Sequence, residues 1–224
     1  MEKLLGKAPL FPLPEGALLP GELLPLHIFE PRYRMMIKAV REGDRMLAIA
    51  TLAPGWEADY HGRPTVQPIV GVGRVVKDRE NPDGTSDIVL QGLMRGRIAR
   101  ELDGKAYRQA VVQLCQPPEE HPAVAFRRRR ALLEGLASRL APPGMRYDVT
   151  AEIDTGLLSD RIASALELSP RERVSMLQAV EADGRVELLL QLLDDTQHGA
   201  RLLSIIPALG DFSLSLSEGQ DRAP

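Results

Sequence analysis

The side chains best suited to contact a ligand are two arginines in a strand-like segment and two aromatic residues in a loop. Arg95 and Arg97 alternate within residues 92–98, so in a β-strand they share one face. Guanidinium groups at a fixed spacing bind carboxylates through paired hydrogen bonds, and ion pairing within the sheet is the structural alternative. Trp56 and Tyr60 lie in a loop marked by Gly and Pro; such aromatics are enriched in interface hot spots, although Trp56 could instead cover the core. The candidate binding residues are Trp56, Tyr60, Arg95 and Arg97.

No local pattern favours catalysis or a cofactor. Both Gly-Lys pairs, at 6–7 and 104–105, are followed by Ala, so neither completes the Gly-x4-Gly-Lys-Ser/Thr loop that holds a nucleotide phosphate. None of the widely separated histidines has a metal-ligand spacing such as His-x3-His; they are His27, His61, His121 and His198. An enzyme would need a catalytic group assembled from distant residues. We therefore expect no catalytic residue, no metal and no cofactor.

Composition narrows the class of protein. A chain of 224 residues can hold one large domain or two small ones. Its net charge of −3 argues against a general nucleic-acid binder. Cys115 is the only cysteine, which rules out an internal disulfide, and it ends an apolar run typical of a packed strand. There is no signal-peptide core and no apolar run approaching 18 residues, so we expect a soluble cytoplasmic protein without a membrane segment.

One junction between a strand and a helix organises the first half of the chain. Residues 24–29 form an apolar run of strand length, and Pro31 suits the first position of a helix over residues 31–42. Glu30 falls at or near the N-cap, where its charge meets the positive end of the helix dipole. The buried face of this helix is predicted to consist of Tyr33, Met36, Ile37 and Val40.

The other elements of this half read as strands with short turns. They are expected at about 9–13, 45–51, 68–77, 86–100 and 107–114, with turns at Asp83-Gly84 and Asp103-Gly104. About six strands around one helix predict a small, strongly bent sheet that closes on itself.

Beyond Pro117-Pro118 the sequence indicates helices. They are expected at about 122–140, 148–168, 170–180 and from 183 to about 205. Four amphipathic helices with short connections predict a small bundle. Arg127 to Arg130 cover every side of one helical turn, which indicates a solvated basic turn, with an RNA or acidic-partner contact as the alternative. The predicted organisation is a β domain over 1–117, a helical domain over 118–207 and a disordered tail over 208–224.

Several phrases of the sequence resemble the signature of the Lon N-terminal domain family, the substrate-binding domain at the front of ATP-dependent Lon proteases. They are Phe11-Pro12-Leu13-Pro14, Leu18-Leu19-Pro20-Gly21, the run from Leu24 to Tyr33, and Gly92-Leu93-Met94-Arg95-Gly96-Arg97-Ile98. The resemblance covers about residues 9 to 206. It implies an α+β fold, with an N-terminal PUA-like β pseudo-barrel that contains one embedded helix and a C-terminal bundle-like domain of four helices.

The resemblance also implies a function. We expect a free-standing, non-catalytic module, without the ATPase and peptidase of a full Lon protease, that binds unfolded polypeptide or a protein partner in the groove between its two parts. An RNA-binding module is the first alternative, because PUA-like barrels often bind RNA, and an undetected enzyme is the second. The identity of the partner, the involvement of a Lon protease and the oligomeric state stay open.

Overall fold

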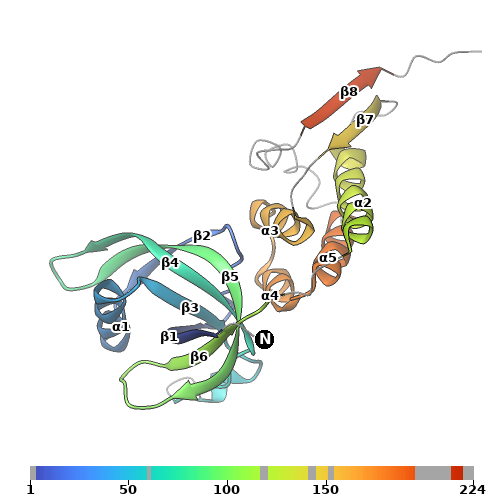
Figure 1. Cartoon of the computed structure of the whole chain (residues 1–224). Coiled ribbons are helices and arrows are strands. Elements are labelled where there is room, and N and C mark those ends of the chain that lie inside the picture. Colours follow the sequence, from blue (N-terminus) through green and yellow to red (C-terminus); the bar gives the residue numbers. More distant parts are fainter. Residues whose placement is uncertain are drawn as a thin grey trace, which may run out of the picture. The chain divides into compact units, whose positions relative to one another are not determined.

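The structure, a computed structural model, describes residues 4–59, 62–116, 121–140, 145–150, 154–194 and 213–218 (Figure 1). The chain divides into two compact units. Unit 1 consists of Met1–Gln116 with Leu168–Val180, and unit 2 of Pro117–Glu167 with Glu181–Pro224. The first unit is therefore discontinuous in sequence, because a segment from the helical half returns to it.

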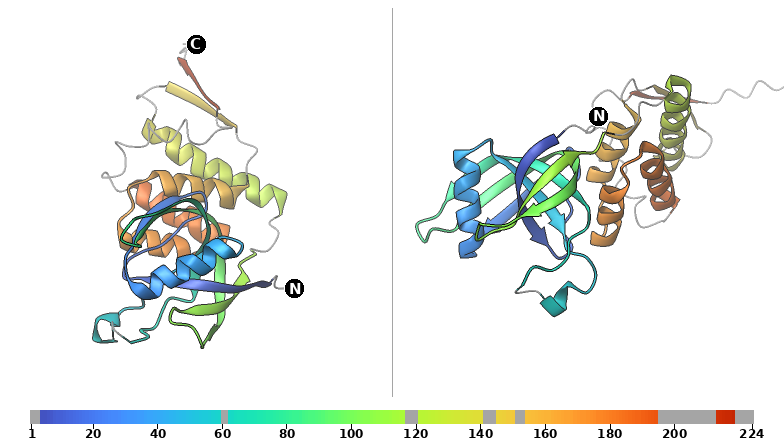
Figure 2. Two further views of the ribbon diagram at one scale, coloured as in Figure 1. Left: turned by 90° about the vertical axis from the view of Figure 1, so that its left-hand side faces the viewer. Right: turned by 60° about the horizontal axis from the view of Figure 1, so that its bottom comes forward.

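Unit 1 is built on a sheet of six strands. Its elements are β1 (Leu4–Leu13), β2 (Leu23–Ile28), α1 (Pro31–Glu42), β3 (Met46–Thr51), the short 3-10 helix η1 (Trp56–Asp59), β4 (Ile69–Glu80), β5 (Ser86–Leu102), β6 (Gln109–Leu114) and α4 (Pro170–Gln178). The strand order is β2-β5-β4-β3-β1-β6, and a further pairing of β5 with β6 closes five of the strands into a ring. Viewed end-on, these strands curl round a common axis (Figure 2). The predicted strands and the predicted closure of the sheet are confirmed.

Two apolar clusters lie on opposite faces of this sheet. The first draws small side chains from the ring strands, including Ala8, Ala48, Val72 and Val112. The second lies between α1 and the strands, and includes Ile49, Ile88 and Leu90. Since β3 contributes to both clusters, all six of its residues are buried. The sheet therefore carries two cores, and the second one requires α1.

The junction that the sequence singles out has the predicted form. Glu30 is the N-cap of α1 in an extended conformation, with Pro at the start of the helix. The Glu30 carboxylate makes no cap bond and instead accepts a hydrogen bond from Arg32 Nε at 2.9 Å. The predicted buried face is confirmed for all four residues, Tyr33, Met36, Ile37 and Val40.

A charged pair ties the end of α1 to the sheet. Arg41 donates from Nε to Asp78 Oδ2 at 2.6 Å and from Nη2 to Asp78 Oδ1 at 2.7 Å. Arg41 also contacts Glu80 on the same strand at 2.8 Å. The hydrogen bonds from Arg41 lower the pKa of the Asp78 carboxyl below its ordinary value of 3.8, although burial opposes them. This two-pronged bond fixes α1 against β4.

Within its described residues, unit 2 contains three helices and a small sheet of two strands that are distant in sequence. Its elements are α2 (Pro122–Leu140), β7 (Met145–Thr150), α3 (Thr155–Ala165), α5 (Ala182–Asp194) and β8 (Ser213–Glu218). The helices contact one another, and β7 pairs antiparallel with β8. In the interior, buried Arg185 lies 3.5 Å from buried Asp160. Within the predicted basic turn, Arg128 pairs with Asp183 and Arg130 with Glu134.

The helical half differs from the expectation in three places. The helix expected from 148 begins only at Thr155, because Met145–Thr150 forms β7. The tail expected to be disordered contains β8. Both strands alternate polar with apolar or β-branched residues, a period of two that reasoning from helix spacing and composition overlooked. The third expected helix, α4, groups with the β-strands of unit 1. The end expected for the fourth helix lies outside the described residues.

Among the helices of the described residues, none combines the length and the apolar character needed to cross a membrane.

We predict that Met36→Asp unfolds unit 1 or lowers its free energy of unfolding by more than ~3 kcal/mol, because it places an unpaired carboxylate where an apolar side chain was enclosed. Met35→Asp is the matched control, since Met35 on the same helix is 50% exposed and Met36 is 0% exposed. Chemical denaturation measures both. Equal stabilities for the two variants would show that the buried face of α1 is wrongly assigned.

We also predict that Asp78→Asn destabilises the protein by about 1–3 kcal/mol at pH 7. Because the folded pKa of Asp78 is lowered, its contribution is fully present above the ordinary value of 3.8 and disappears as the pH falls through the folded pKa. The difference in the free energy of unfolding between variant and wild type, measured by chemical denaturation, should therefore decrease progressively below about pH 4. Glu42→Gln, at an exposed position of α1, is the control. A difference that persists unchanged into acid would contradict the assignment.

Candidate functional site

Two adjoining cavities of unit 1 lie beside the strand–helix junction. One measures about 250 Å³ and the other about 350 Å³. They share four lining residues, which are Arg32, Tyr33, Gly62 and Arg108. We call their combined lining the signature groove. It consists of Phe11–Leu13 of β1 with Pro14 after it, Leu26–Tyr33 at the junction apart from Ile28 and Pro31, Leu52, Gly62–Pro64 of the following loop, and Asp103–Arg108.

The junction side of the groove is aromatic. Phe11 and Tyr33 meet edge to face with ring centroids 4.5 Å apart, and the Arg32 guanidinium lies 4.6 Å from the Tyr33 ring centre. Phe29 lines the groove and is 62% exposed, and its ring stacks on His27 at 6.2 Å. This exposed aromatic pair offers apolar contact area at the mouth of the groove.

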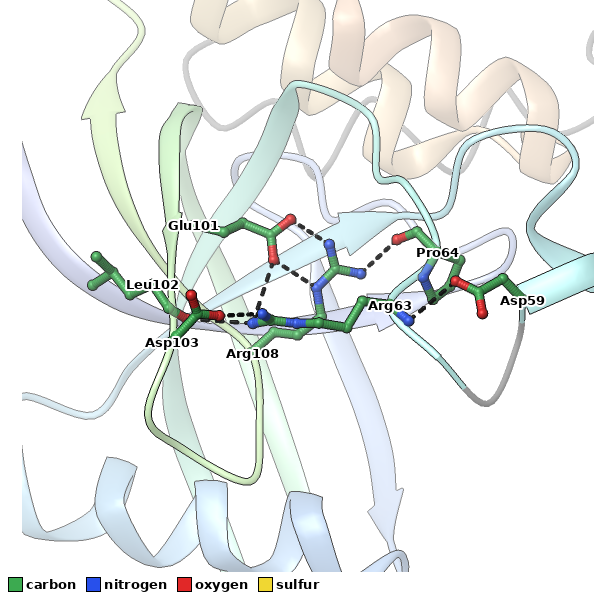
Figure 3. A network of polar contacts seen from close by, with 7 residues as sticks. All are labelled: Asp59, Arg63, Pro64, Glu101, Leu102, Asp103 and Arg108. Atoms are coloured by element: carbon green, nitrogen blue, oxygen red, sulfur yellow. Dashed lines mark hydrogen bonds and ion pairs between the residues drawn. The ribbon is translucent and has the colours of Figure 1, made fainter.

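A polar network forms the opposite side (Figure 3). Arg108 donates from Nε to Glu101 at 2.9 Å and from Nη1 to the Pro64 carbonyl at 2.7 Å. Arg63 pairs with Asp103, and its backbone N–H donates to the Asp59 carboxylate at 3.2 Å. The network therefore fixes the loop that carries η1 to the β5–β6 turn. It also places a carboxylate against both arginines, so the wall is close to electrically balanced.

Of the two aromatic loop residues named from the sequence, the structure describes only one. Trp56 begins η1 and is half-buried, neither a fully enclosed lid nor an open tip. Tyr60 lies outside the described residues. The loop reaches the groove through Gly62 and Pro64, and their neighbour Arg63 holds it there.

Arg95 and Arg97, the two arginines named from the sequence, lie in different environments. Their strand register is regular, with Gly71 opposite Arg95 and Ile69 opposite Arg97, so they point to one face as predicted. Arg97 is exposed, but Arg95 is only 6% exposed because α4 covers it. Arg95 donates from Nε to the Leu177 carbonyl at 3.0 Å and from Nη2 to the Met176 carbonyl at 2.8 Å. It thus caps the last turn of α4, whose carbonyls lack helical partners.

Further bonds hold α4 on unit 1. Gln178 Nε2 donates to the Ile69 carbonyl at 2.9 Å, and Arg173 pairs with Glu22. The helix begins with a capping box of Ser169 and Glu172. Arg95 therefore positions a helix, and it is not available to a ligand while α4 is docked.

Reasoning from the sequence missed the arginines that build the groove wall. Arg63 and Arg108 stand in no motif, and Arg108 bonds to Pro64, 44 positions away. Only the turn signal Asp103-Gly104 pointed to this region. His27 of the signature phrase bonds through Nδ1 to Asp87 at 2.7 Å and lowers the pKa of that exposed carboxyl. Within the described residues, no group of three or more His, Cys, Asp or Glu side chains is placed to hold a metal ion.

Residues 7–195 match the family described as the ATP-dependent protease La (LON) substrate-binding domain. The chain belongs to this family. The resemblance drawn from the signature phrases is therefore confirmed. Among curated Lon proteases, that of Cytophaga hutchinsonii is 25% identical over 198 residues, which are 83% of this chain and 24% of that protein. The Lon protease of Escherichia coli K12 is 22% identical over 191 residues, again 83% of this chain and 24% of that protein. The chain thus spans about a quarter of the length of these relatives.

Solved structures of the family share the fold. The Lon N-terminal domain protein from Xanthomonas campestris superposes with a TM-score of 0.57 at 22% identity, over 83% of this chain and 97% of that one. The N-terminal domain of Mycobacterium avium complex Lon protease gives a TM-score of 0.61 at 16% identity, over 85% and 99%. At these identities the likeness establishes the mixed α+β fold of Lon N-terminal domains and leaves the binding residues open.

We predict that Arg95→Ala destabilises unit 1 by about 2–4 kcal/mol, because it removes charge-assisted bonds and leaves two carbonyls without donors. Arg97→Ala, two residues along the same face, should change stability by less than ~0.5 kcal/mol. Amide exchange measures the effect, and the amides of α4 should lose protection first in Arg95→Ala. Equal stability and equal amide protection of α4 in the two variants would show that Arg95 does not cap α4.

Proposed function

We propose that this chain is a non-catalytic polypeptide-binding module, which binds unfolded segments or a protein partner along the signature groove of unit 1. The observation that carries the proposal is a groove with an exposed aromatic mouth and a fixed polar wall, in a chain of the substrate-binding family. The ATP hydrolysis and peptide cleavage of a complete Lon protease are not assigned to this chain.

The chemistry of the groove suits a peptide. Phe29 at its mouth and Leu13 along its edge offer apolar contacts, while Lys105 at the far end is an exposed cation. A peptide presents apolar side chains beside backbone amides, so it can use both surfaces of the groove. Because α4 covers Arg95, we place binding on the Trp56 side of the unit and not on the Arg95/Arg97 face.

RNA binding is the weaker candidate. The groove arginines Arg63 and Arg108 already face Glu101 or Asp103, so they add little net positive charge for phosphates. The net charge of the chain is −3, and phosphate binding depends on unpaired cations. Tight RNA binding that weakens steeply as salt is raised would reverse this order.

We predict that Trp56→Ala weakens the binding of an unfolded polypeptide by at least ~1 kcal/mol, about fivefold in Kd, with little change in Tm. The probe is reduced, carboxymethylated ribonuclease A, which is permanently unfolded and contains no tryptophan. Trp56 is the only tryptophan of the chain, so its fluorescence reports directly on the loop and should shift when the probe is added.

The matched control is Phe126→Ala, at an aromatic residue of α2 in unit 2 that is 53% exposed. It should leave probe binding unchanged. Two results together would contradict a contact between Trp56 and the probe: fluorescence of Trp56 that changes with neither a quencher nor the probe, and a loss of stability in Trp56→Ala. Trp56 would then be a lid on the core, and the groove would bind without it. Absence of probe binding by the wild-type protein would refute the proposed function.

A further inference from the structure

One strand of unit 1 has an unpaired edge. The strands β5, β4, β3, β1 and β6 close into a ring, whereas β2 lies outside it and pairs only with β5. In the described part of the chain no strand lies on the other side of β2. The alternating exposure of Leu23, Pro25 and His27 shows in addition that one face of β2 meets solvent. An open edge presents backbone groups that can pair with another strand.

The direction of the backbone groups along β2 follows from one hydrogen bond. Gly92 N–H donates to the Glu22 carbonyl at 2.8 Å, immediately before β2. Backbone groups point alternately to the two sides of a strand, so Leu24, Leu26 and Ile28 bond toward β5. Leu23, Pro25 and His27 therefore turn their backbone groups to the open side. Pro25 fits this phase, because its missing N–H costs no bond to β5.

The open edge has a defined set of donors and acceptors. Leu23 and His27 each offer an N–H and a carbonyl, about 13 Å apart at the rise of a strand, and Pro25 between them offers a carbonyl alone. The segment Leu23–Ile28 contains no Lys, Arg, Asp or Glu, and Pro25 is its one residue of the kinds that protect sheet edges. Leu23 is 59% exposed, so an apolar side chain flanks the unpaired groups.

We propose that an extended segment of an unfolded polypeptide adds to this edge as a further strand beside β2. The inference rests on the proposed function and names its binding mode. Backbone groups are common to every sequence, so strand addition accepts diverse unfolded chains, while Leu23 and Phe29 favour apolar side chains. The edge also runs into the signature groove, because Leu26, His27 and Phe29 line it.

A second copy of this chain is a poorer occupant. Symmetric antiparallel pairing of two β2 strands about Pro25 places the two prolines opposite each other. Neither proline has an N–H, so neither central carbonyl finds a donor across the pair. A polypeptide with any other residue at that position donates its N–H to the Pro25 carbonyl. The hydrogen-bonding pattern thus favours a different chain.

Amide hydrogen exchange followed by NMR tests the proposal, with reduced, carboxymethylated ribonuclease A as the probe. In the free protein the Leu23 and His27 amides should exchange rapidly, while those of Leu24, Leu26 and Ile28 are protected. Saturation with the probe should slow exchange at Leu23 and His27 by about tenfold or more. Binding without that protection would overturn strand addition and leave the proposed function standing. Absence of binding would overturn both.

Two substitutions at one position separate the backbone from the side chain. Leu23→Pro removes the outward N–H, and should weaken probe binding about tenfold. Leu23→Ala keeps the N–H, and should weaken binding less than about threefold. Equal losses in the two variants would overturn the proposal. If Leu23→Pro fails to fold, the exchange measurement on the wild-type protein decides. Leu23 and His27 amides that become protected as the protein concentration rises, without probe, would overturn it in favour of self-association.

Discussion

The packing of α1 against the sheet is the constraint on which the rest of unit 1 depends. The first cluster combines small side chains such as Ala48 with larger ones such as Leu10 and Met46, and it contains no residue of α1. The second cluster is different, because Met36 and Ile37 of α1 supply the cover for Ile88 and Leu90. Burial of each such side chain contributes roughly 1.5–3 kcal/mol. The same packing keeps β2 on the sheet, since Ile28 and the inner side chains of β2 belong to that cluster.

This arrangement explains why the residues that line the groove gather at one junction. Pro31 starts α1 directly after β2, so the helix that closes the core also fixes Glu30, Arg32 and the exposed Phe29. On the other side of the groove, Arg108 and Arg63 hold the η1 loop to the β5–β6 turn. A rigid wall of this kind spares a ligand the entropy of ordering the site. The groove thus results from two separate sets of contacts: the packing of α1 on the sheet, and the bonds that hold the η1 loop to the β5–β6 turn.

The elements of unit 1 could be predicted from the sequence because their signals are local. Proline before the helix, glycine in the turns and the spacing of Tyr33, Met36, Ile37 and Val40 act within a few residues. Arg95 shows where such reasoning ends. Its place in the strand and the face it shares with Arg97 follow from alternation, but its burial depends on α4, whose carbonyls lie 81 and 82 positions away. No periodicity encodes that contact. The strands β7 and β8 do carry a local period of two, but their pairing joins segments that are far apart in the sequence.

The distribution of charge bears on what the proposed site can recognise. In the groove wall the arginines face Glu101 and Asp103, Arg32 faces Glu30, and at the edge strand His27 bonds to Asp87. Charges that are already paired contribute little to ligand selectivity, because a charged ligand must displace an existing partner. The outward backbone groups of Leu23, Pro25 and His27 have no strand partner among the described residues, and they lie next to exposed apolar surface. A site that selects through backbone groups and apolar contact distinguishes an extended chain from a folded one, and it does so with little regard to sequence. That is the discrimination that the proposed function requires, and in the proposed binding mode it follows from leaving one strand outside a closed ring.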